Sequence, residues 1–258
     1  MRILRFSNNS EPQYGILESD NLISILSGDP LYSGIQKTGK QIKLEDVKVL
    51  APVLPRSKIV NVGKNFRDHA EEMGGGVPVE PLIFLTPNTA VIGPNETIVW
   101  PRISERIDFE GELAIVIGRI CKDVPRERYR EVIFGYTIAN DVTARDLQKV
   151  DGQWTRAKGF DGFCPIGPWI DTEFAPLNQK ISAKVNGEIK QQDVLSNMVF
   201  KIGQIIEFVT EAMTLLPGDV ILTGTPAGVS AMPEGADIEI EIEGLGSLKN
   251  KLSAKPKP

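Results

Sequence analysis

Apolar residues occur along this chain mainly in short runs separated by polar residues and glycine, a pattern typical of β-strands. In the first 50 residues such runs centre on Leu4, Ile16 and Ile25, with asparagine, serine and glycine at the intervening turns. A stiff, proline-rich connector follows at residues 51–55. We therefore expect a small N-terminal domain over residues 1–54, with a structural or dimer-forming role, and a larger domain over residues 55–258.

Helical patterns are fewer than strand patterns. Residues 202–213 place isoleucine, valine and methionine at helical spacing. A second helix is expected over residues 65–73, with Asn65 as its cap, and a short one begins near residues 125–130. Asn-Gly at 186–187 predicts a tight hairpin. The whole pattern indicates a mixed, β-rich α+β fold.

The stretch at residues 108–118 is the most informative strand. Side chains two apart on a strand point to the same face, so Glu110 and Glu112 would lie side by side, roughly 6–7 Å apart along the backbone. Two carboxylates at the entrance of an apolar strand need a cation or a shared proton. The pair therefore predicts two ligands of a divalent metal; the alternative is an exposed strand end with two solvated glutamates.

A second apolar strand, residues 132–140, leads directly into Asp141. With Glu110 and Glu112 it completes a set of hard oxygen donors that suits Mg²⁺ or Mn²⁺, with Ca²⁺ as a possible substitute. Arg145 and Gln148 then share one helical face and could form a fork for an anionic group, or could simply belong to a surface helix.

Three further segments carry candidate chemistry. His69 is the only histidine and lies three residues before Glu72, so the two would be adjacent on a helix, as a general base and its orienting carboxylate are. The alternative is a surface or packing histidine. Gly74–Gly76 could serve as a hinge for this helix, making it a candidate lid. Lys158 could place a cation over a site, and residues 223–225 could offer donors to an anion or form an ordinary turn.

Composition narrows the class of protein. The net charge of −5 argues against a nucleic-acid partner. The two cysteines form no metal-binding pattern and suit a reducing, cytoplasmic location. No apolar run approaches the roughly 20 residues needed to cross a bilayer, so we expect no membrane association, and the first residues do not resemble a signal peptide.

Taken in order, these motifs resemble the fumarylacetoacetate hydrolase family, in its acylpyruvase and 2-hydroxyhepta-2,4-diene-1,7-dioate isomerase-like branch. The resemblance spans about residues 55 to 250 and rests on residues 62–72, 108–113, 140–148, 158–161 and 223–226. It implies a β-roll catalytic domain, a homodimer, and Mg²⁺ or Mn²⁺ at Glu110, Glu112 and Asp141. It also implies a His69–Glu72 pair on a lid, and a substrate pocket lined by Arg145, Gln148, Lys158 and Thr225.

Two positions depart from the family pattern. Many members have lysine where this chain has Thr86, and many have tyrosine where it has Phe66. The absence of that lysine removes one cation from the expected pocket. The resemblance therefore defines the family more closely than it defines the substrate.

The resemblance implies an enzyme that acts on a small, anionic 2-oxo (β-diketo) acid through a metal-stabilised enolate. We expect C–C hydrolysis of an acylpyruvate-type substrate, with His69 and Glu72 activating water and Lys158 adding positive charge near the developing oxyanion. Oxaloacetate-type decarboxylation and 2-hydroxyhepta-2,4-diene-1,7-dioate isomerisation are alternatives, because one site supports all three. A catalytically silent, ligand-binding homologue is the second alternative.

Overall fold

A computed structural model describes residues 1–9 and 11–257. Most of its strands form one 12-stranded sheet, whose main path runs β4-β3-β2-β1-β14-β12-β11-β17-β6-β7, with β5 paired to β1 and β8 to β14. The strands of this sheet are β1 (Arg2–Ser7), β2 (Gln13–Leu17), β3 (Leu22–Leu26), β4 (Lys37–Lys43), β5 (Lys48–Leu50), β6 (Ile59–Gly63), β7 (Leu82–Thr86), β8 (Val91–Ile92), β11 (Gly111–Ile117), β12 (Ile133–Asn140), β14 (Cys164–Asp171) and β17 (Val220–Leu222).

A five-stranded sheet packs against this one, and a two-stranded ribbon completes the strands. The five-stranded sheet has the order β16-β15-β18-β19-β9 and the ribbon is β10-β13. Their bounds are β9 (Thr97–Ile98), β10 (Ile107–Asp108), β13 (Thr143–Ala144), β15 (Lys180–Val185), β16 (Glu188–Val194), β18 (Asp237–Ile242) and β19 (Gly246–Leu252). The predicted mixed, β-rich fold is confirmed, and β15 and β16 form the hairpin expected at Asn186–Gly187.

Helices are short and lie around the sheets. The α-helices are α1 (Pro30–Ser33), α2 (Arg67–Glu72), α3 (Arg145–Asp151), α4 (Thr155–Lys158) and α5 (Ile202–Ala212). The 3-10 helices are η1 (Ser19–Asn21), η2 (Leu44–Asp46), η3 (Asn88–Ala90), η4 (Arg126–Val132) and η5 (Leu195–Asn197). Within the described part of the chain, no helix is long and apolar enough to cross a membrane.

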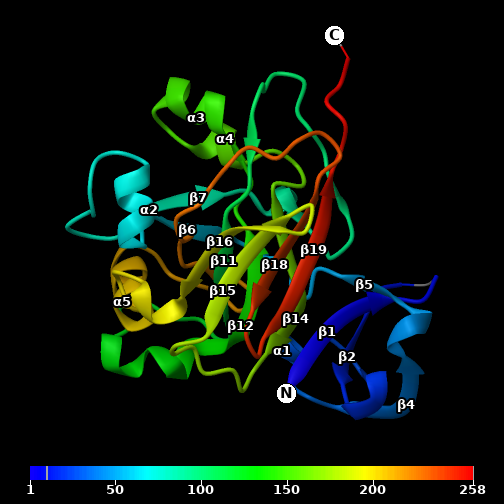
Figure 1. Ribbon diagram of the computed structural model, residues 1–258. Helices are drawn as coiled ribbons and strands as arrows, with labels where there is room; N and C mark the ends of the chain where they lie inside the picture. The colour runs from blue at the N-terminus through cyan, green and yellow to red at the C-terminus, as the bar shows by residue number, and fades with distance from the viewer. Residues whose placement is uncertain (10, 258) are drawn as a thin grey trace.

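The N-terminal strands extend the large sheet. β1 pairs with β14 at Arg2↔Asp171 and Ile3↔Ile170, so hydrogen bonds of the sheet join the first 50 residues to the remainder. Figure 1 shows these strands in blue at one end of the molecule, away from α2, α3 and α4. The N-terminal strands therefore add to the sheet at a distance from those three helices.

The core lies between the two sheets. Leu113, Ile115 and Ile117 on β11 are fully buried in one cluster with Ile240 and Ile242 of β18. Ala114 and Val116, on the opposite face of β11, belong to a second cluster. This alternation is the period of two expected for a strand, and it confirms that residues two apart on this segment share a face.

One local prediction was wrong. Asn65 does not cap a helix: α2 begins at Arg67 after Phe66, and the Asn65 amide instead donates to the carbonyls of Thr223 (2.7 Å) and Phe200 (3.1 Å). A buried asparagine stabilises whichever backbone groups would otherwise lack partners, and here those belong to distant segments. The short helix expected to begin near residues 125–130 is present, as the 3-10 helix η4 (Arg126–Val132).

Strand direction brings the functional segments to one edge of the sheet. β11 runs antiparallel to β12 and to β17, and β17 runs parallel to β6. The start of β11 therefore lies beside the ends of β12 and β17, at the same edge of the sheet as the end of β6. Gly111 pairs with Asn140, so Glu110 and Asp141 each lie one residue beyond a paired position.

Candidate active site

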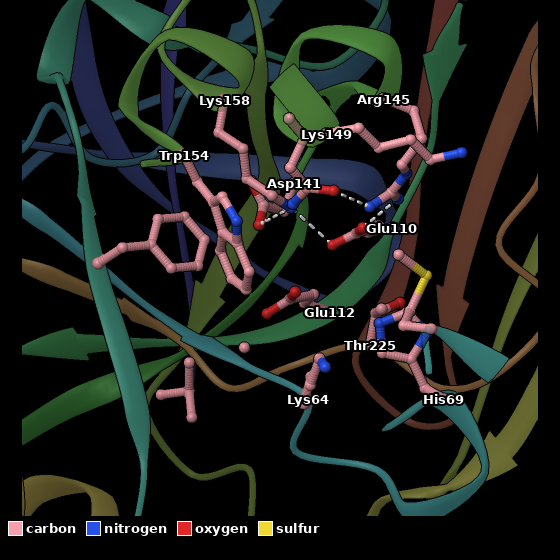
Figure 2. A pocket seen from close by; sticks show the side chains of 15 residues that line it. Lys64, His69, Glu110, Glu112, Asp141, Arg145, Lys149, Trp154, Lys158 and Thr225 are labelled. Carbon is pink, nitrogen blue, oxygen red and sulfur yellow. Dashed lines mark hydrogen bonds and ion pairs between the residues drawn. The ribbon is translucent and has the colours of Figure 1, made fainter. Parts of the chain in front are cut away.

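Three carboxylates meet at this edge of the sheet. Glu110, Glu112 and Asp141 each offer one oxygen, and these atoms lie within 4.8 Å of one another. All three side chains are buried, at 5%, 2% and 3% exposure respectively. Figure 2 shows them inside a pocket between α2, α3 and α4. The side-by-side placement expected from the strand pattern is present, and the solvated alternative does not hold.

The carboxylates differ in how their charge is balanced. The Lys158 ammonium contacts Glu110 Oε2 (2.8 Å) and Asp141 Oδ2 (2.6 Å) and is itself 2% exposed. Glu112 accepts a hydrogen bond from the backbone N–H of Gly224 at 2.6 Å. Among the described residues, no side-chain cation contacts it.

The pKa values follow this asymmetry. Burial opposes ionisation of Glu110, but the Lys158 and Arg145 charges outweigh burial and lower its pKa to about 2. Burial raises the pKa of Glu112 well above its usual range, and the charges of Asp141 and Glu110 raise it further. Burial and the Glu110 charge raise the pKa of Asp141 to about 6, against the opposing effect of Lys158.

This donor set fits a divalent cation. Three buried carboxylates with hard oxygen ligands face one another, and one of them lacks a positive partner in the described chain. Like charges at this separation in a buried site require a counter-charge or retained protons. Mg²⁺ and Mn²⁺ prefer such ligands and leave positions for substrate.

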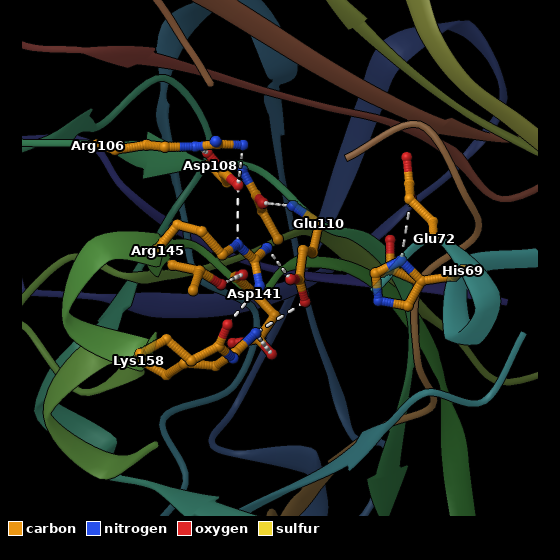
Figure 3. A network of polar contacts seen from close by, with 12 residues as sticks. His69, Glu72, Arg106, Asp108, Glu110, Asp141, Arg145 and Lys158 are labelled. Atoms are coloured by element: carbon orange, nitrogen blue, oxygen red, sulfur yellow. Dashed lines mark hydrogen bonds and ion pairs between the residues drawn. The ribbon is translucent and has the colours of Figure 1, made fainter. Parts of the chain in front are cut away.

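Arg145 is held beside the carboxylates by a network of buried contacts (Figure 3). Its Nη2 contacts Glu110 Oε1 (2.5 Å), its Nη1 donates to Gln148 Oε1 (2.6 Å) and its Nε donates to Asp108 Oδ2 (2.8 Å). Asp108 is fully buried and also binds Arg106 through both oxygens. Arg145 and Gln148 do share a helical face and touch, but the fork rests on Glu110 and Asp108, not directly on Asp141.

His69 forms part of the pocket wall on α2. The side chain is buried, so it is not the surface histidine of the alternative interpretation. Its Nδ1 lies 3.5 Å from Glu72 Oε2, beyond a good hydrogen bond, while Glu72 accepts from the backbone N–H of Gly228 at 3.2 Å. Burial lowers the pKa of His69 despite the attraction of Glu110. The imidazole is therefore neutral near pH 7, as a general base requires.

Thr225 also lines the pocket, although its hydroxyl group donates a hydrogen bond to the backbone. It donates to the carbonyl of Gly111 (2.9 Å) and accepts from the Gln191 amide (2.8 Å), which ties the loop after β17 to the start of β11. Thr223 performs a similar role through the carbonyl of Leu113.

The pocket is lined by all the candidate side chains of the sequence analysis except Glu72, which contacts His69 from outside the lining. Its cavity measures about 160 Å³. The sequence analysis gave no pocket role to seven of its lining residues, which are Val62, Gly63, Lys64, Met73, Phe84, Lys149 and Trp154. Lys64 lies inside a quoted motif and Lys149 follows Gln148 directly, so both had a positional signal; Trp154 and Phe84 had none.

The two departures from the family pattern are buried outside this cavity. Thr86 is 3% exposed and its hydroxyl accepts a 2.7 Å hydrogen bond from the Asn61 amide. Phe66 is 1% exposed and forms an isolated β-bridge with Met198. Neither residue supplies a charge to the pocket.

Comparisons with known proteins identify the family of this chain. The family model described as fumarylacetoacetate (FAA) hydrolase C-terminal matches residues 58–253, and the model described as Rv2993c-like, N-terminal matches residues 1–52. The chain therefore belongs to the fumarylacetoacetate hydrolase family, and its buried acidic triad could hold a divalent metal.

The names of individual relatives differ in whether they state an activity. The chain is 55% identical to Protein Rv2993c of Mycobacterium tuberculosis, over 86% of this chain and 84% of that protein. It is 40% identical to the mitochondrial oxaloacetate tautomerase Fahd2a of Rattus norvegicus, over 82% and 71% of the two chains.

The names of similar solved structures also state different activities. The chain is similar to a 2-hydroxyhepta-2,4-diene-1,7-dioate isomerase from Mycobacterium marinum, with 45% identity, TM-score 0.92 and full coverage of both chains. It also matches a maleylpyruvate hydrolase from Sphingobium, with 28% identity and TM-score 0.81 over 98% of this chain and 99% of that one. Membership of the family therefore does not select among these reactions.

Proposed function

We propose that this protein is a divalent-metal-dependent enzyme that forms the enolate of a short 2-oxo acid, and that its reaction is C–C hydrolysis of an acylpyruvate-type substrate. The observation that carries the proposal is the neutral, buried His69 in the same small cavity as the Glu110, Glu112 and Asp141 triad. The cavity volume of about 160 Å³ suits a short substrate.

Glu110, Glu112 and Asp141 would hold Mg²⁺ or Mn²⁺. When bound there, the cation would act as a Lewis acid that polarises the 2-oxo group and favours the enolate. Arg145 and Gln148 would orient the substrate carboxylate, since further N–H groups of the guanidinium remain available. Lys158 would add positive charge near the developing oxyanion.

His69 would supply the water-dependent step. The neutral imidazole takes a proton from water while the water oxygen attacks the distal acyl carbon. The C–C bond then breaks, its electron pair passes to the pyruvate enolate, and a proton returned to the enolate carbon gives pyruvate and a carboxylic acid. Glu72 would orient the imidazole once the 3.5 Å gap between them closes.

A second candidate is proton transfer or decarboxylation at the same enolate, without C–C hydrolysis. Two observations favour it: relatives with 40% and 45% identity are named an oxaloacetate tautomerase and an isomerase, and the His69–Glu72 contact is open. Neither reaction consumes water, so His69 would be dispensable for the decarboxylation.

The test is pyruvate release from acetylpyruvate and from oxaloacetate, with and without Mg²⁺, in the wild type and in His69→Ala. Acetylpyruvate cleavage that needs both Mg²⁺ and His69 supports hydrolysis. Consumption of oxaloacetate alone, retained in the variant, supports the second candidate. Failure to turn over any 2-oxo acid while Mg²⁺ binds would support a silent ligand-binding homologue. The homodimer stays a prediction, which light scattering tests.

A further inference from the structure

We infer that Gln191 is a positioning residue that couples the carboxylate triad to the His69–Glu72 pair, through the loop of residues 223–228 that follows β17. This role rests on the proposed function, because it assigns the cation to the triad and the water-dependent step to His69. Gln191 would act on the site only through other groups, since it is not one of the residues that line the cavity.

Gln191 is a buried amide at the edge of the five-stranded sheet. It lies on β16, the edge strand, and its side chain is 1% exposed. A buried amide costs free energy unless its donors and its acceptor have hydrogen-bond partners. The partners of Gln191 therefore indicate which parts of the chain the side chain holds in place.

The oxygen of the amide holds the backbone between two of the triad carboxylates. Gln191 Oε1 accepts a hydrogen bond from the backbone N–H of Gly111 at 3.0 Å. The hydroxyl of Thr225 donates to the carbonyl of the same glycine at 2.9 Å. Because Gly111 separates Glu110 from Glu112, these two bonds fix the backbone from which both carboxylates project.

The nitrogen of the amide holds the loop of residues 223–228. Gln191 Nε2 donates to Thr225 Oγ1 at 2.8 Å and to the carbonyl of Pro226 at 2.6 Å. Gly228 also packs directly on β16, because a Cβ at this glycine would lie 2.0 Å from the carbonyl oxygen of Lys190. The strand therefore holds the loop through the Gln191 side chain and through the backbone of the residue before it.

This loop contacts both parts of the site. The N–H of Gly224 donates to Glu112 Oε2 at 2.6 Å, and the N–H of Gly228 donates to Glu72 Oε2 at 3.2 Å. Glu72 Oε2 lies 3.5 Å from His69 Nδ1 (Figure 3), a buried atom without a hydrogen-bond partner among the described residues. A displacement of the loop would therefore move a triad carboxylate and the carboxylate beside His69 together.

The experiment replaces Gln191 by methionine, which keeps most of the side-chain volume and removes all three hydrogen bonds. Gln191→Asn is a milder second variant, because it keeps the amide but is one methylene too short to span the same groups. Gln192→Met is the matched control, since Gln192 is the next residue on β16 and its side chain is exposed.

Two properties of the folded protein are measured for each variant. Titration calorimetry gives the Mg²⁺ affinity. NMR of protein labelled with ¹⁵N-histidine gives the imidazole signals in the metal-free state, and these signals belong to His69 because it is the only histidine. A residue that only stabilised the fold would lower Tm and leave both properties of the folded protein unchanged.

We expect both Gln191 variants to bind Mg²⁺ about tenfold more weakly than the wild type, because groups that orient metal ligands have effects of this size. We also expect their His69 signals to shift, while Gln192→Met matches the wild type in both measurements. An unchanged Mg²⁺ affinity, or unchanged His69 signals, in the folded Gln191 variants would overturn the coupling alone. A wild type that binds neither Mg²⁺ nor Mn²⁺ would overturn the proposed function, and the coupling with it.

Discussion

Replacement of Lys158 by methionine tests the electrostatic balance of the site. Methionine keeps most of the side-chain volume but leaves Glu110 and Asp141 without the ammonium that lies 2.8 Å and 2.6 Å from their oxygens. Because all three groups are buried, loss of one partner should lower the free energy of unfolding of the metal-free protein by about 3–5 kcal/mol. For a chain of this size that corresponds to a fall in Tm of roughly 10 °C.

The same substitution should strengthen metal binding. A cation that approaches the triad is repelled by the Lys158 charge, so its removal should raise Mg²⁺ affinity by at least about tenfold. The assay is thermal unfolding at increasing Mg²⁺, at about pH 8, where fewer protons compete with the cation for the carboxylates than at neutral pH. Turnover should nevertheless fall, because the charge near the oxyanion is lost.

A matched control separates this effect from the general cost of losing a lysine. Lys249 pairs with Glu239 on the protein surface and its side chain is 61% exposed. Lys249→Met should change the free energy of unfolding by less than about 1 kcal/mol and leave Mg²⁺ affinity unaltered. An equal Tm in wild type and Lys158→Met, or weaker Mg²⁺ binding by the variant, would refute the reasoning.

Three further predictions concern the same network. Because the pKa values of Glu112 and Asp141 are raised, a cation must displace protons from these carboxyl groups at acid pH. Titration calorimetry should therefore show that Mg²⁺ affinity increases from about pH 5 to about pH 7.5. For the same reason, the metal-free protein should lose stability as the pH rises through about 6. A Mg²⁺ affinity that does not change over this pH range would contradict the prediction. Asp141→Asn should abolish Mg²⁺ binding, and retained affinity in titrations would refute the ligand assignment. Asp108→Asn should raise KM more than it lowers kcat, because Arg145 loses its anchor; Asp108→Glu should restore part of the affinity, and an unchanged KM would count against this role.

Much of the triad was predictable because it depends on strand periodicity. The β-strand period of two places Glu110 and Glu112 together, and β-pairing brings Asp141 from the neighbouring strand to the same edge. The first relation is local in sequence. The second follows once two apolar strands are taken to be neighbours, so the sequence pattern and the family resemblance led to the same three residues.

The partners of the charged groups were less predictable. That Arg145 rests on Asp108, and that Lys158 bridges Glu110 and Asp141, depends on contacts across 17 to 48 residues. No local pattern specifies such a pairing. The missed role of Asn65 has the same origin, because its partners lie more than 130 residues away.

The place of Lys64 and Lys149 in the pocket lining was missed for a different reason. Most lysines in a sequence are solvated surface residues, and Lys64 and Lys149 have the same local appearance. What distinguishes them is that they line the cavity and that no acidic side chain of the described residues pairs with them, and both properties exist only in three dimensions. The open distance between His69 and Glu72 likewise depends on the placement of α2, beyond the helical spacing that predicted their proximity.

The central claim is that the carboxylate site forms the enolate of a 2-oxo acid. The most direct measurement is exchange of the C3 protons of pyruvate for solvent deuterium, followed by NMR, with and without Mg²⁺, in wild type and Asp141→Asn. The account predicts exchange well above the buffer rate only in the wild type with Mg²⁺. Exchange at the buffer rate in the wild type with Mg²⁺ and pyruvate both bound, or equal exchange in the variant, would contradict it.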